Sequence, residues 1–366
     1  MEHRKLHATD AEPQRALVVA VDLQDPQRPL APELAEFIAL AKAAGVQVVG
    51  EVVQRLPHVD PSTLVGSGKA REIAERADEL KANTLFVFND LRPRQRTNLE
   101  KVIPLPIVDR TMLILDIFAQ HARSREGQLQ VELAQLRYRQ SNLIGVGAAL
   151  SRLGGGVGTR GPGETKLEVD RRKIQQRVTL LQRQLDEVRR QRETRRGGRG
   201  PDPFVALVGY TNVGKSSLLN RLAGAGQGQG AFVADQPFAT LDPTLRRAYV
   251  APGRNVRLAD TVGFITALPQ ELVNAFRATL EELAGADLLL HVSDASNPDW
   301  PRQQASVETI LRELKLDEKP TIHVFNKVDR LDAAARAALP SGGIDVSAAT
   351  GAGIDELRAA IAERLS

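Results

Sequence analysis

The feature that most constrains the fold is a glycine-rich loop, GYTNVGKS at 209–216, which directly follows the apolar run FVALV. The loop satisfies the pattern G-x-x-x-x-G-K-[ST], and a helix-like stretch follows it. A strand, such a loop and a helix in that order bind phosphate through backbone N–H groups and the positive end of the helix. Glycine-rich turns also begin helices for purely structural reasons, but here the strand and helix context is met too. The loop therefore predicts a doubly wound α/β domain that binds a nucleotide.

Each residue type in the loop has a role in such a site. Gly209 and Gly214 allow backbone N–H groups to wrap the β-phosphate. Lys215 is expected to reach the β- and γ-phosphate oxygens, and the Ser216 hydroxyl to join the shell of a Mg²⁺ ion. The predicted nucleotide contacts in the loop are Gly209, Tyr210, Thr211, Asn212, Val213, Gly214, Lys215 and Ser216.

A second motif, DTVG, begins at Asp260 and ends the apolar run VRLAD. Asp260 is placed to hold a magnesium-bound water, and the Gly263 N–H to sense the γ-phosphate. Between this motif and the loop lies FVADQPFATLDPT, in which Thr240 is the candidate for the second hydroxyl ligand of Mg²⁺. We expect Lys215, Thr240 and Gly263 to act in hydrolysis. The predicted nucleotide contacts here are Phe238, Ala239, Thr240, Leu241, Asp242, Asp260, Thr261, Val262 and Gly263.

A third motif, NKVD at 326–329, follows the run TIHVF. Its Asp329 carboxylate can accept hydrogen bonds from guanine N1–H and the exocyclic amine together, and adenine offers no such pair of donors. A fourth motif, SAA at 347–349, is expected to place a backbone N–H near guanine O6. Each short motif alone is weak, but four in order at strand ends jointly predict GTP as the substrate. The predicted base contacts are Asn326, Lys327, Val328, Asp329, Ser347, Ala348 and Ala349.

Two residues near the phosphates predict unusual catalysis. Many small GTPases have Gln after the DxxG glycine to orient the attacking water, but here Phe264 follows Gly263 and cannot hydrogen-bond water. We therefore expect slow intrinsic hydrolysis. Asn212 stands where GTPases that use K⁺ beside the phosphates also have Asn, whose carbonyl can coordinate the ion. An Asn that only braces the loop explains this position equally well.

Two other glycine motifs are not expected to bind nucleotides. The run GSGK at 66–69 has Thr63 where a phosphate loop needs Gly, so we interpret it as a turn and a helix start. The run GVGTRG at 156–161 matches G-x-G-x-x-G, but no strand precedes it and a charged helix follows.

The rest of the chain predicts two further parts. Residues 1–110 alternate strand and helix patterns, which indicates a small α/β domain with a parallel sheet. Residues 111–200 carry two apolar stripes at spacings of three and four, joined by a glycine-rich stretch at 145–164, which predicts an antiparallel helical hairpin with a flexible tip. The linker RRGGRGPDP then leads into the nucleotide-binding domain at 201–366. In that domain we expect switch segments at 232–244 and 260–275.

Charge and composition indicate the kind of binding partner and the cellular compartment. Residues 121–200 hold 18 Lys and Arg against 8 Asp and Glu, a net charge of +10 in a chain whose total is +4, so the hairpin is suited to a polyanion such as RNA. The absence of cysteine excludes disulfides, thiolate catalysis and Cys-based zinc sites. No apolar run approaches the length of a membrane span, and no signal peptide is visible. We expect a cytoplasmic protein.

The chain resembles the HflX family of translational GTPases. The resemblance rests on GYTNVGKSS, FATLDPT, DTVGF and NKVD, and above all on the glycine-rich run RLGGGVGTRGPGETKLEVDRR, and it extends over essentially the full length. It implies a GTPase that binds the large ribosomal subunit, dissociates stalled ribosomes under stress and hydrolyses GTP faster on the ribosome. It also implies some capacity to bind ATP.

Two alternative functions stay open at this point. One is a signalling GTPase that acts on a protein effector through the hairpin, and the other is a ribosome-assembly or RNA-remodelling factor that does not split mature ribosomes. In our preferred interpretation the hairpin contacts rRNA, GTP sets the conformation of the switches with Mg²⁺ bound, and the protein acts as a monomer. K⁺ is a second cofactor if Asn212 coordinates an ion rather than bracing the loop.

Overall fold

The computed structural model describes residues 13–26, 28–153, 162–196, 202–224, 238, 244–266 and 281–366. These residues form two compact units. The first comprises the chain up to Ile117 together with Gln135–Gln176, and the second comprises Phe118–Ala134 and Arg177–Ser366. Each unit is treated by itself below.

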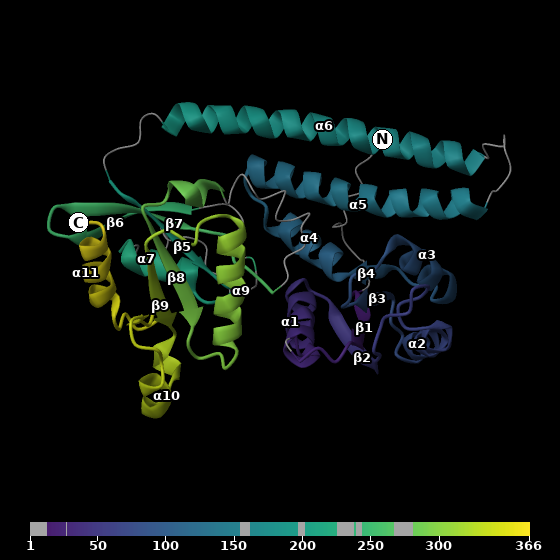
Figure 1. Cartoon of the computed structure of the whole chain (residues 1–366), viewed down its shortest axis with the longest axis horizontal. Helices are drawn as coiled ribbons and strands as arrows, with labels where there is room; N and C mark the ends of the chain where they lie inside the picture. Colours follow the sequence, from purple (N-terminus) through teal and green to yellow (C-terminus); the bar gives the residue numbers. More distant parts are fainter. Residues whose placement is uncertain are drawn as a thin grey trace. The chain divides into compact units, whose positions relative to one another are not determined.

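The first unit is built on a parallel four-stranded sheet of order β2-β1-β3-β4 (Figure 1). Its strands are Val-, Ile- and Leu-rich, as expected for strands of a parallel sheet. The strands are β1 (Arg15–Asp22), β2 (Gln47–Arg55), β3 (Thr84–Val87) and β4 (Ile107–Asp109). The connecting helices are α1 (Leu30–Ala43), α2 (Ser67–Glu79) and α3 (Pro93–Val102).

At β3 both faces of this sheet are buried. Leu85 and Val87 belong to the same apolar cluster as Ile73 of α2, whereas the ring of Phe86 lies 6.3 Å from that of Phe37 in α1. Alternate side chains of β3 therefore pack into the apolar layers on opposite faces of the sheet. The GSGK run is a helix start, as predicted, because Gly66 with φ of +80° immediately precedes α2.

Long helices follow the first sheet, as predicted: α4 (Arg110–His121), α5 (Arg125–Leu153) and α6 (Pro162–Arg196). Arg177 of α6 forms a two-point ion pair with Glu132 of α5, its Nε lying 2.7 Å from Oε1. Gln140 and Gln175 are hydrogen-bonded at 2.7 Å. These contacts connect two helices whose sequence order requires a reversal between them, which agrees with a hairpin.

The glycine-rich tip is shorter than the predicted 145–164. Helix α5 continues to Leu153, so it includes Arg152, and α6 already begins at Pro162. Alanine and leucine favour the helix strongly enough here to carry it past Gly145 and Gly147. The second glycine motif, at 156–161, lies outside the described residues.

The second unit contains a six-stranded sheet of order β10-β9-β8-β5-β7-β6, in which only β6 is antiparallel to its neighbour (Figure 1). The strands are β5 (Phe204–Gly209), β6 (Thr244–Ala251), β7 (Arg254–Asp260), β8 (Leu288–Asp294), β9 (Thr321–Asn326) and β10 (Ile344–Asp345). The helices are α7 (Lys215–Leu222), α9 (Trp300–Glu313), α10 (Ala333–Ala337) and α11 (Ile354–Arg364), with 3-10 turns η1 (Glu281–Gly285) and η2 (Val328–Arg330). This is the predicted doubly wound α/β arrangement.

One edge of this sheet is formed by β6. Its Leu245 and Tyr249 side chains are exposed, at 59% and 53%, and Arg247 is exposed between them. Arg247 forms an ion pair with Asp202 at 2.8 Å.

Among the described helices, none is both long and apolar enough to cross a lipid bilayer. The division of the chain at 1–110, 111–200 and 201–366 stays a prediction.

Candidate functional site

The predicted phosphate loop lies at the carboxyl end of the central strand β5, between β7 and β8. The DTVG motif follows β7, NKVD follows β9, and SAA follows β10. All these strands run parallel, so their carboxyl ends meet at one edge of the sheet. In open α/β sheets ligands bind at this edge.

Backbone conformation explains the two loop glycines. Gly209 has φ of +154°, and a Cβ there would lie 2.2 Å from the carbonyl oxygen of Val292. Gly214 has φ of +93°, and its Cβ would lie 2.4 Å from Nδ2 of Asn326. A side chain at either position would push apart the strands and loops that form the cradle.

Lys215 begins α7 and is buried under the loop. Its Nζ donates hydrogen bonds to the carbonyl oxygens of Gly209 at 3.1 Å and Tyr210 at 2.7 Å. Burial lowers the pKa of Lys215 to about 8, and the nearby Asp260 carboxylate only partly opposes this shift. Burial therefore destabilises the charged form of the Lys215 amine, and a phosphate anion beside it would stabilise that form.

Ser216, a predicted Mg²⁺ ligand, lies beside Asp260, the residue predicted to hold a magnesium-bound water. The Ser216 hydroxyl donates to Oδ2 of Asp260 at 2.5 Å, and Asp260 is fully buried at the end of β7. A hydroxyl and a carboxylate fit Mg²⁺, which prefers oxygen ligands and keeps several waters. Thr240, the other predicted ligand, lies outside the described residues, as do Ala239, Leu241 and Asp242.

Asn326 ties three of the motifs together. Its Nδ2 donates to the Val213 carbonyl oxygen at 2.8 Å, and its Oδ1 accepts from the Ala348 N–H at 3.0 Å. The Ala348 N–H is thus used within the protein, which leaves Ala349 as the candidate for guanine O6. The Asp329 carboxylate is exposed in η2, where a base can approach it.

Lys327 also braces the loop. Its Nζ donates to the carbonyl oxygen of Asn212 at 2.7 Å and pairs with Asp294 of β8 at 2.7 Å. Asn212 has φ of +60°, in the left-handed region that Asn tolerates better than most residues. The side chain of Asn212 is exposed, so it remains accessible to an ion.

The start of the second switch is bonded directly to the phosphate loop. Phe264 donates its N–H to Gly209 at 3.1 Å, and its carbonyl oxygen accepts from the Thr211 N–H at 2.8 Å. The Tyr210 hydroxyl accepts from the Thr266 N–H at 2.7 Å and lies 2.8 Å from the Thr266 hydroxyl. Phe264 itself is buried, so its ring lies in the core rather than beside the phosphates.

Thr261 and Phe238 make contacts of a structural kind. The Thr261 hydroxyl donates to the Leu207 carbonyl oxygen at 2.7 Å, which joins β7 to β5. Phe238 is buried, and its ring packs edge-on against Phe118 of α4 at 4.5 Å. This packing orients the Phe238 ring toward a helix.

Three residues of the site were missed from the sequence. Asp294 binds Lys327, Thr266 binds Tyr210, and Arg221 donates from Nε to the Ala348 carbonyl oxygen at 3.0 Å. Asp294 could have been found, because it stands at a strand end like the other motifs. Thr266 and Arg221 carry no such signal.

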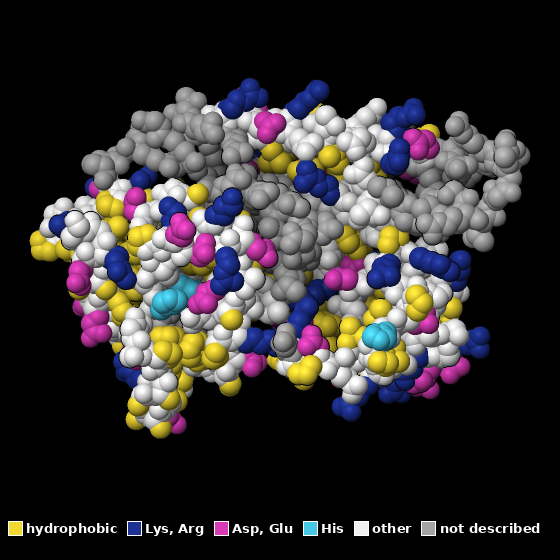
Figure 2. Space-filling model, viewed as in Figure 1, with side chains coloured by type: hydrophobic (Ala, Val, Ile, Leu, Met, Phe, Trp, Pro, Cys, Tyr) yellow, Lys and Arg dark blue, Asp and Glu magenta, His cyan; other side chains and the backbone are white. Residues whose placement is uncertain are grey.

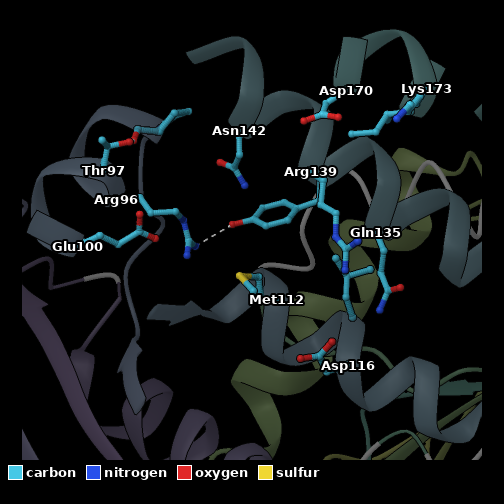
Figure 3. Close-up of a pocket in the computed structure, with 14 residues that line it drawn as sticks. Arg96, Thr97, Glu100, Met112, Asp116, Gln135, Arg139, Asn142, Asp170 and Lys173 are labelled. Atoms are coloured by element: carbon cyan, nitrogen blue, oxygen red, sulfur yellow. Dashed lines mark hydrogen bonds between the residues drawn. The ribbon is translucent and has the colours of Figure 1, made fainter. Parts of the chain in front are cut away.

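A separate cavity of about 620 Å³ lies in the first unit, lined by side chains of α3, α4, α5 and α6 (Figure 3). Arg96 and the Tyr138 hydroxyl both bond the buried carboxylate of Asp109, and Arg96 also donates to the Tyr138 hydroxyl at 3.3 Å. Burial raises the pKa of Asp116 on the cavity wall, and Arg139 opposes this shift. The charges in this cavity largely compensate one another.

Comparison with known proteins identifies the family. The chain is 47% identical to the GTPase HflX of Lacrimispora saccharolytica, over 94% of this chain and 81% of that protein. This chain belongs to the GTPase HflX family. The HflX protein of Escherichia coli K12 is 46% identical over 91% of this chain and 79% of its own length.

Three family models together cover most of this HflX chain. Residues 31–119 match the GTP-binding GTPase N-terminal family, residues 121–199 the GTP-binding GTPase middle region, and residues 204–327 the 50S ribosome-binding GTPase family. A solved structure described as the complex of SsGBP with GDP is 25% identical, with a TM-score of 0.50, over 95% of this chain and 98% of that one. The resemblance deduced from the motifs is confirmed, and the chain is a GTPase.

Proposed function

We propose that this chain is a cytoplasmic GTPase that binds the large ribosomal subunit and dissociates stalled ribosomes under stress. The observation that carries the proposal is the match of residues 204–327 to a family described as a 50S ribosome-binding GTPase. The membership of the HflX family supports it over the length of the chain.

The proposed reaction is the hydrolysis of GTP to GDP and phosphate. Lys215 exchanges its two loop carbonyl partners for phosphate oxygens, and the Gly263 N–H contacts the γ-phosphate. Ser216 and Thr240 would hold Mg²⁺ and Asp260 would hold a water bound to it, and the ion would neutralise phosphate charge. Asp329 binds the guanine edge.

The attacking water lacks a side-chain partner after the DxxG glycine, because Phe264 is apolar and buried. A GTPase without a water-orienting group hydrolyses GTP slowly until a partner supplies one or orders the switches. We therefore propose that the ribosome stimulates hydrolysis. Asn212 is proposed to bind K⁺ beside the phosphates, which would supply part of the missing stabilisation.

The proposed rRNA-binding surface is the hairpin. Its net charge over 121–200 is +10, and Lys and Arg side chains project along the described face of α6 in Figure 2. Arg172, Lys173 and Arg183 of α6 are exposed. Exposed positive side chains bind the phosphate backbone irrespective of sequence.

Sedimentation of ribosomes with the full-length protein tests the proposal. With a non-hydrolysable GTP analogue we expect the protein to sediment with the large subunit, and with GTP we expect 70S ribosomes to separate into subunits. GDP should support neither. Binding to precursor particles alone would favour an assembly factor, and no binding in any nucleotide state would contradict the ribosomal role.

A further inference from the structure

Two histidines of the GTPase domain occupy equivalent positions on neighbouring strands. His291 of β8 and His323 of β9 are paired in register, with ring centroids 5.3 Å apart. Each stands three residues before the polar residue that ends its strand, namely Asp294 and Asn326. The parallel register therefore places both imidazoles on one face of the sheet.

Helix α9 brings two further polar side chains to the same place. Gln304 and Glu308 are one turn apart, and Nε2 of Gln304 donates to Oε1 of Glu308 at 2.9 Å. The same Nε2 lies 3.5 Å from Nδ1 of His323. Residues at i and i+4 share one face of a helix, so both side chains face the histidines.

The cluster contains buried polar atoms that lack a hydrogen-bond partner among the described residues. His291 is only 1% exposed, and its Nε2 has none. Oε1 of Gln304 is likewise buried without one. Native proteins rarely leave such atoms unsatisfied, so two of them in one cluster indicate a bound species.

The ligand atoms lie close enough together for one ion. One donor atom from each of His291, Glu308 and His323 lies within 4.8 Å of the other two, and no other group of three His, Cys, Asp or Glu residues in the described ranges does this. A cavity of about 360 Å³ reaches the cluster from solvent. Its walls include Trp300, Gln304, Glu308, His323 and Phe325.

We propose that His291, Glu308 and His323 bind a divalent transition metal, with Zn²⁺ as the best match. Two imidazoles and one carboxylate are a typical zinc ligand set, whereas Mg²⁺ prefers oxygen ligands alone. A water would complete the four-coordinate shell.

The ion would fasten α9 to the middle of the sheet, apart from the nucleotide. The strands it joins end in Asp294 and Asn326. Asp294 pairs with Lys327, which bonds the phosphate loop, and Asn326 bonds that loop directly. The metal is therefore structural for the site and not the ion that contacts phosphate. A bound water that satisfies His291 is the alternative occupant.

Metal titration of the full-length protein tests the site. The protein is treated with a chelator, loaded with GDP and excess Mg²⁺ so that the nucleotide site is filled, and titrated with Zn²⁺ against a chromogenic competitor. We expect one tight site per chain, and Co²⁺ in its place should give the visible absorption of a tetrahedral complex. Zn²⁺ should also raise the melting temperature.

Matched variants locate the ion. His323→Gln and Glu308→Gln should each weaken Zn²⁺ binding at least tenfold and remove the rise in melting temperature. His58→Gln and Glu313→Gln carry the same substitutions at exposed positions and should bind Zn²⁺ normally. Retained GDP binding shows that a variant is folded. Absence of a tight site, or equal binding by all four variants, would overturn the proposal in favour of a water-filled polar cluster.

Discussion

At the scale of single residues, guanine selectivity is expected to reside in the exposed Asp329 carboxylate. Asp329→Asn should shift preference from GTP toward XTP, because the amide can donate to the xanthine oxygen that replaces the guanine amine. A hydrogen bond to a charged group contributes about 1.5–3 kcal/mol, so GTP affinity should fall roughly 10- to 100-fold. Competition binding with both nucleotides measures this.

Asp332→Asn is the matched control for that experiment. Asp332 is three residues away and caps α10 by accepting the Ala335 N–H at 2.7 Å, so it has no part in base binding. Unchanged GTP selectivity in Asp329→Asn, or an equal shift in Asp332→Asn, would remove our account of the NKVD motif.

Lys215 predicts a proton linkage in nucleotide binding. With a pKa of about 8 in the nucleotide-free protein, its amine is mostly neutral at pH 9. Phosphate beside it raises that pKa, so binding at pH 9 should take up close to one proton, whereas below pH 7 the amine is charged before and after binding. Calorimetry of GDP binding at pH 9 in two buffers of different ionisation enthalpy measures the uptake. A binding enthalpy independent of the buffer would contradict it.

The same residue sets a stability trend for the nucleotide-free protein. Unfolding returns the pKa of Lys215 from about 8 to the ordinary lysine value of 10.5, so the unfolded chain binds more protons between these values. This residue's contribution to the free energy of unfolding therefore rises with pH from about 8 to 10.5.

Asn212 in the phosphate loop either binds K⁺ or only braces the loop, and hydrolysis rates distinguish the two explanations. If its side chain binds K⁺, hydrolysis should be faster in K⁺ than in Na⁺, and Asn212→Ala should abolish the difference. Because φ at this position is +60°, Asn212→Gly is the necessary second variant, since it removes the side chain without backbone strain. Single-turnover rates in both salts measure the effect, and equal rates in the unmodified protein would leave Asn212 as a brace.

The motif residues were predictable because each motif fixes a residue type at a strand end. The hydrogen-bond partners of the motif residues were not predictable, as Asn326 and Lys327 show. The sequence predicts that both lie near the nucleotide, but not that they bond the carbonyl oxygens of Val213 and Asn212. Such contacts depend on which loop atoms meet in space, and residue spacing does not encode that.

At the scale of elements, the Tyr210 hydroxyl fastens the second switch to the phosphate loop. Tyr210→Phe removes the acceptor of the Thr266 N–H while the ring stays packed. The loss should cost about 1 kcal/mol locally, which makes amide exchange at Thr266 roughly fivefold faster. Hydrogen exchange of the nucleotide-free protein measures this, and exchange at Val324 in β9 should not change. Unaltered exchange at Thr266 would show that the backbone bonds of Phe264 suffice.

Strands and helices were largely predictable, and the hairpin tip was not. Buried runs such as FVALV leave few alternatives to a strand, and Gly45, with φ of +83°, lies just past the end of α1, where glycine commonly stops a helix. At the tip, glycine composition suggested a flexible loop from 145, yet α5 reaches Leu153. Isolated glycines lower helix stability by only about 1 kcal/mol each, which neighbouring Ala and Leu residues can offset.

At the scale of the whole molecule, the hairpin should carry the contact with rRNA. The double variant Arg152→Ala, Arg160→Ala should leave GTP binding intact, because the phosphate loop follows β5 and lies outside the hairpin. It should weaken ribosome-stimulated hydrolysis and subunit dissociation. The salt dependence of ribosome binding should become shallower by roughly one unit per lost phosphate contact. Arg152 belongs to α5, whereas Arg160 lies outside the described residues.

A matched control for that experiment is Arg177→Ala, since Arg177 is paired with Glu132 within the hairpin. It should not alter the salt slope. Normal splitting by the Arg152 and Arg160 double variant would make the tip a connector and place the rRNA contact elsewhere.

The grouping of the chain into compact units was not predictable. Composition suggested that the hairpin is one part, whereas packing assigns Gln135–Gln176 to the first unit and both Phe118–Ala134 and the chain from Arg177 to the second. Long helices contact different neighbours along their length, and a pattern of spacings shows only that a face is apolar, not what covers it.

The edge strand β6 has a consequence for self-association. An exposed strand edge is a template on which a second copy can extend the sheet, and the exposed Leu245 and Tyr249 add an apolar incentive. In an antiparallel pairing centred on Arg247, however, this residue would stand opposite its own copy. Like charges directly opposite each other destabilise such a pair, so Arg247 disfavours this two-fold dimer.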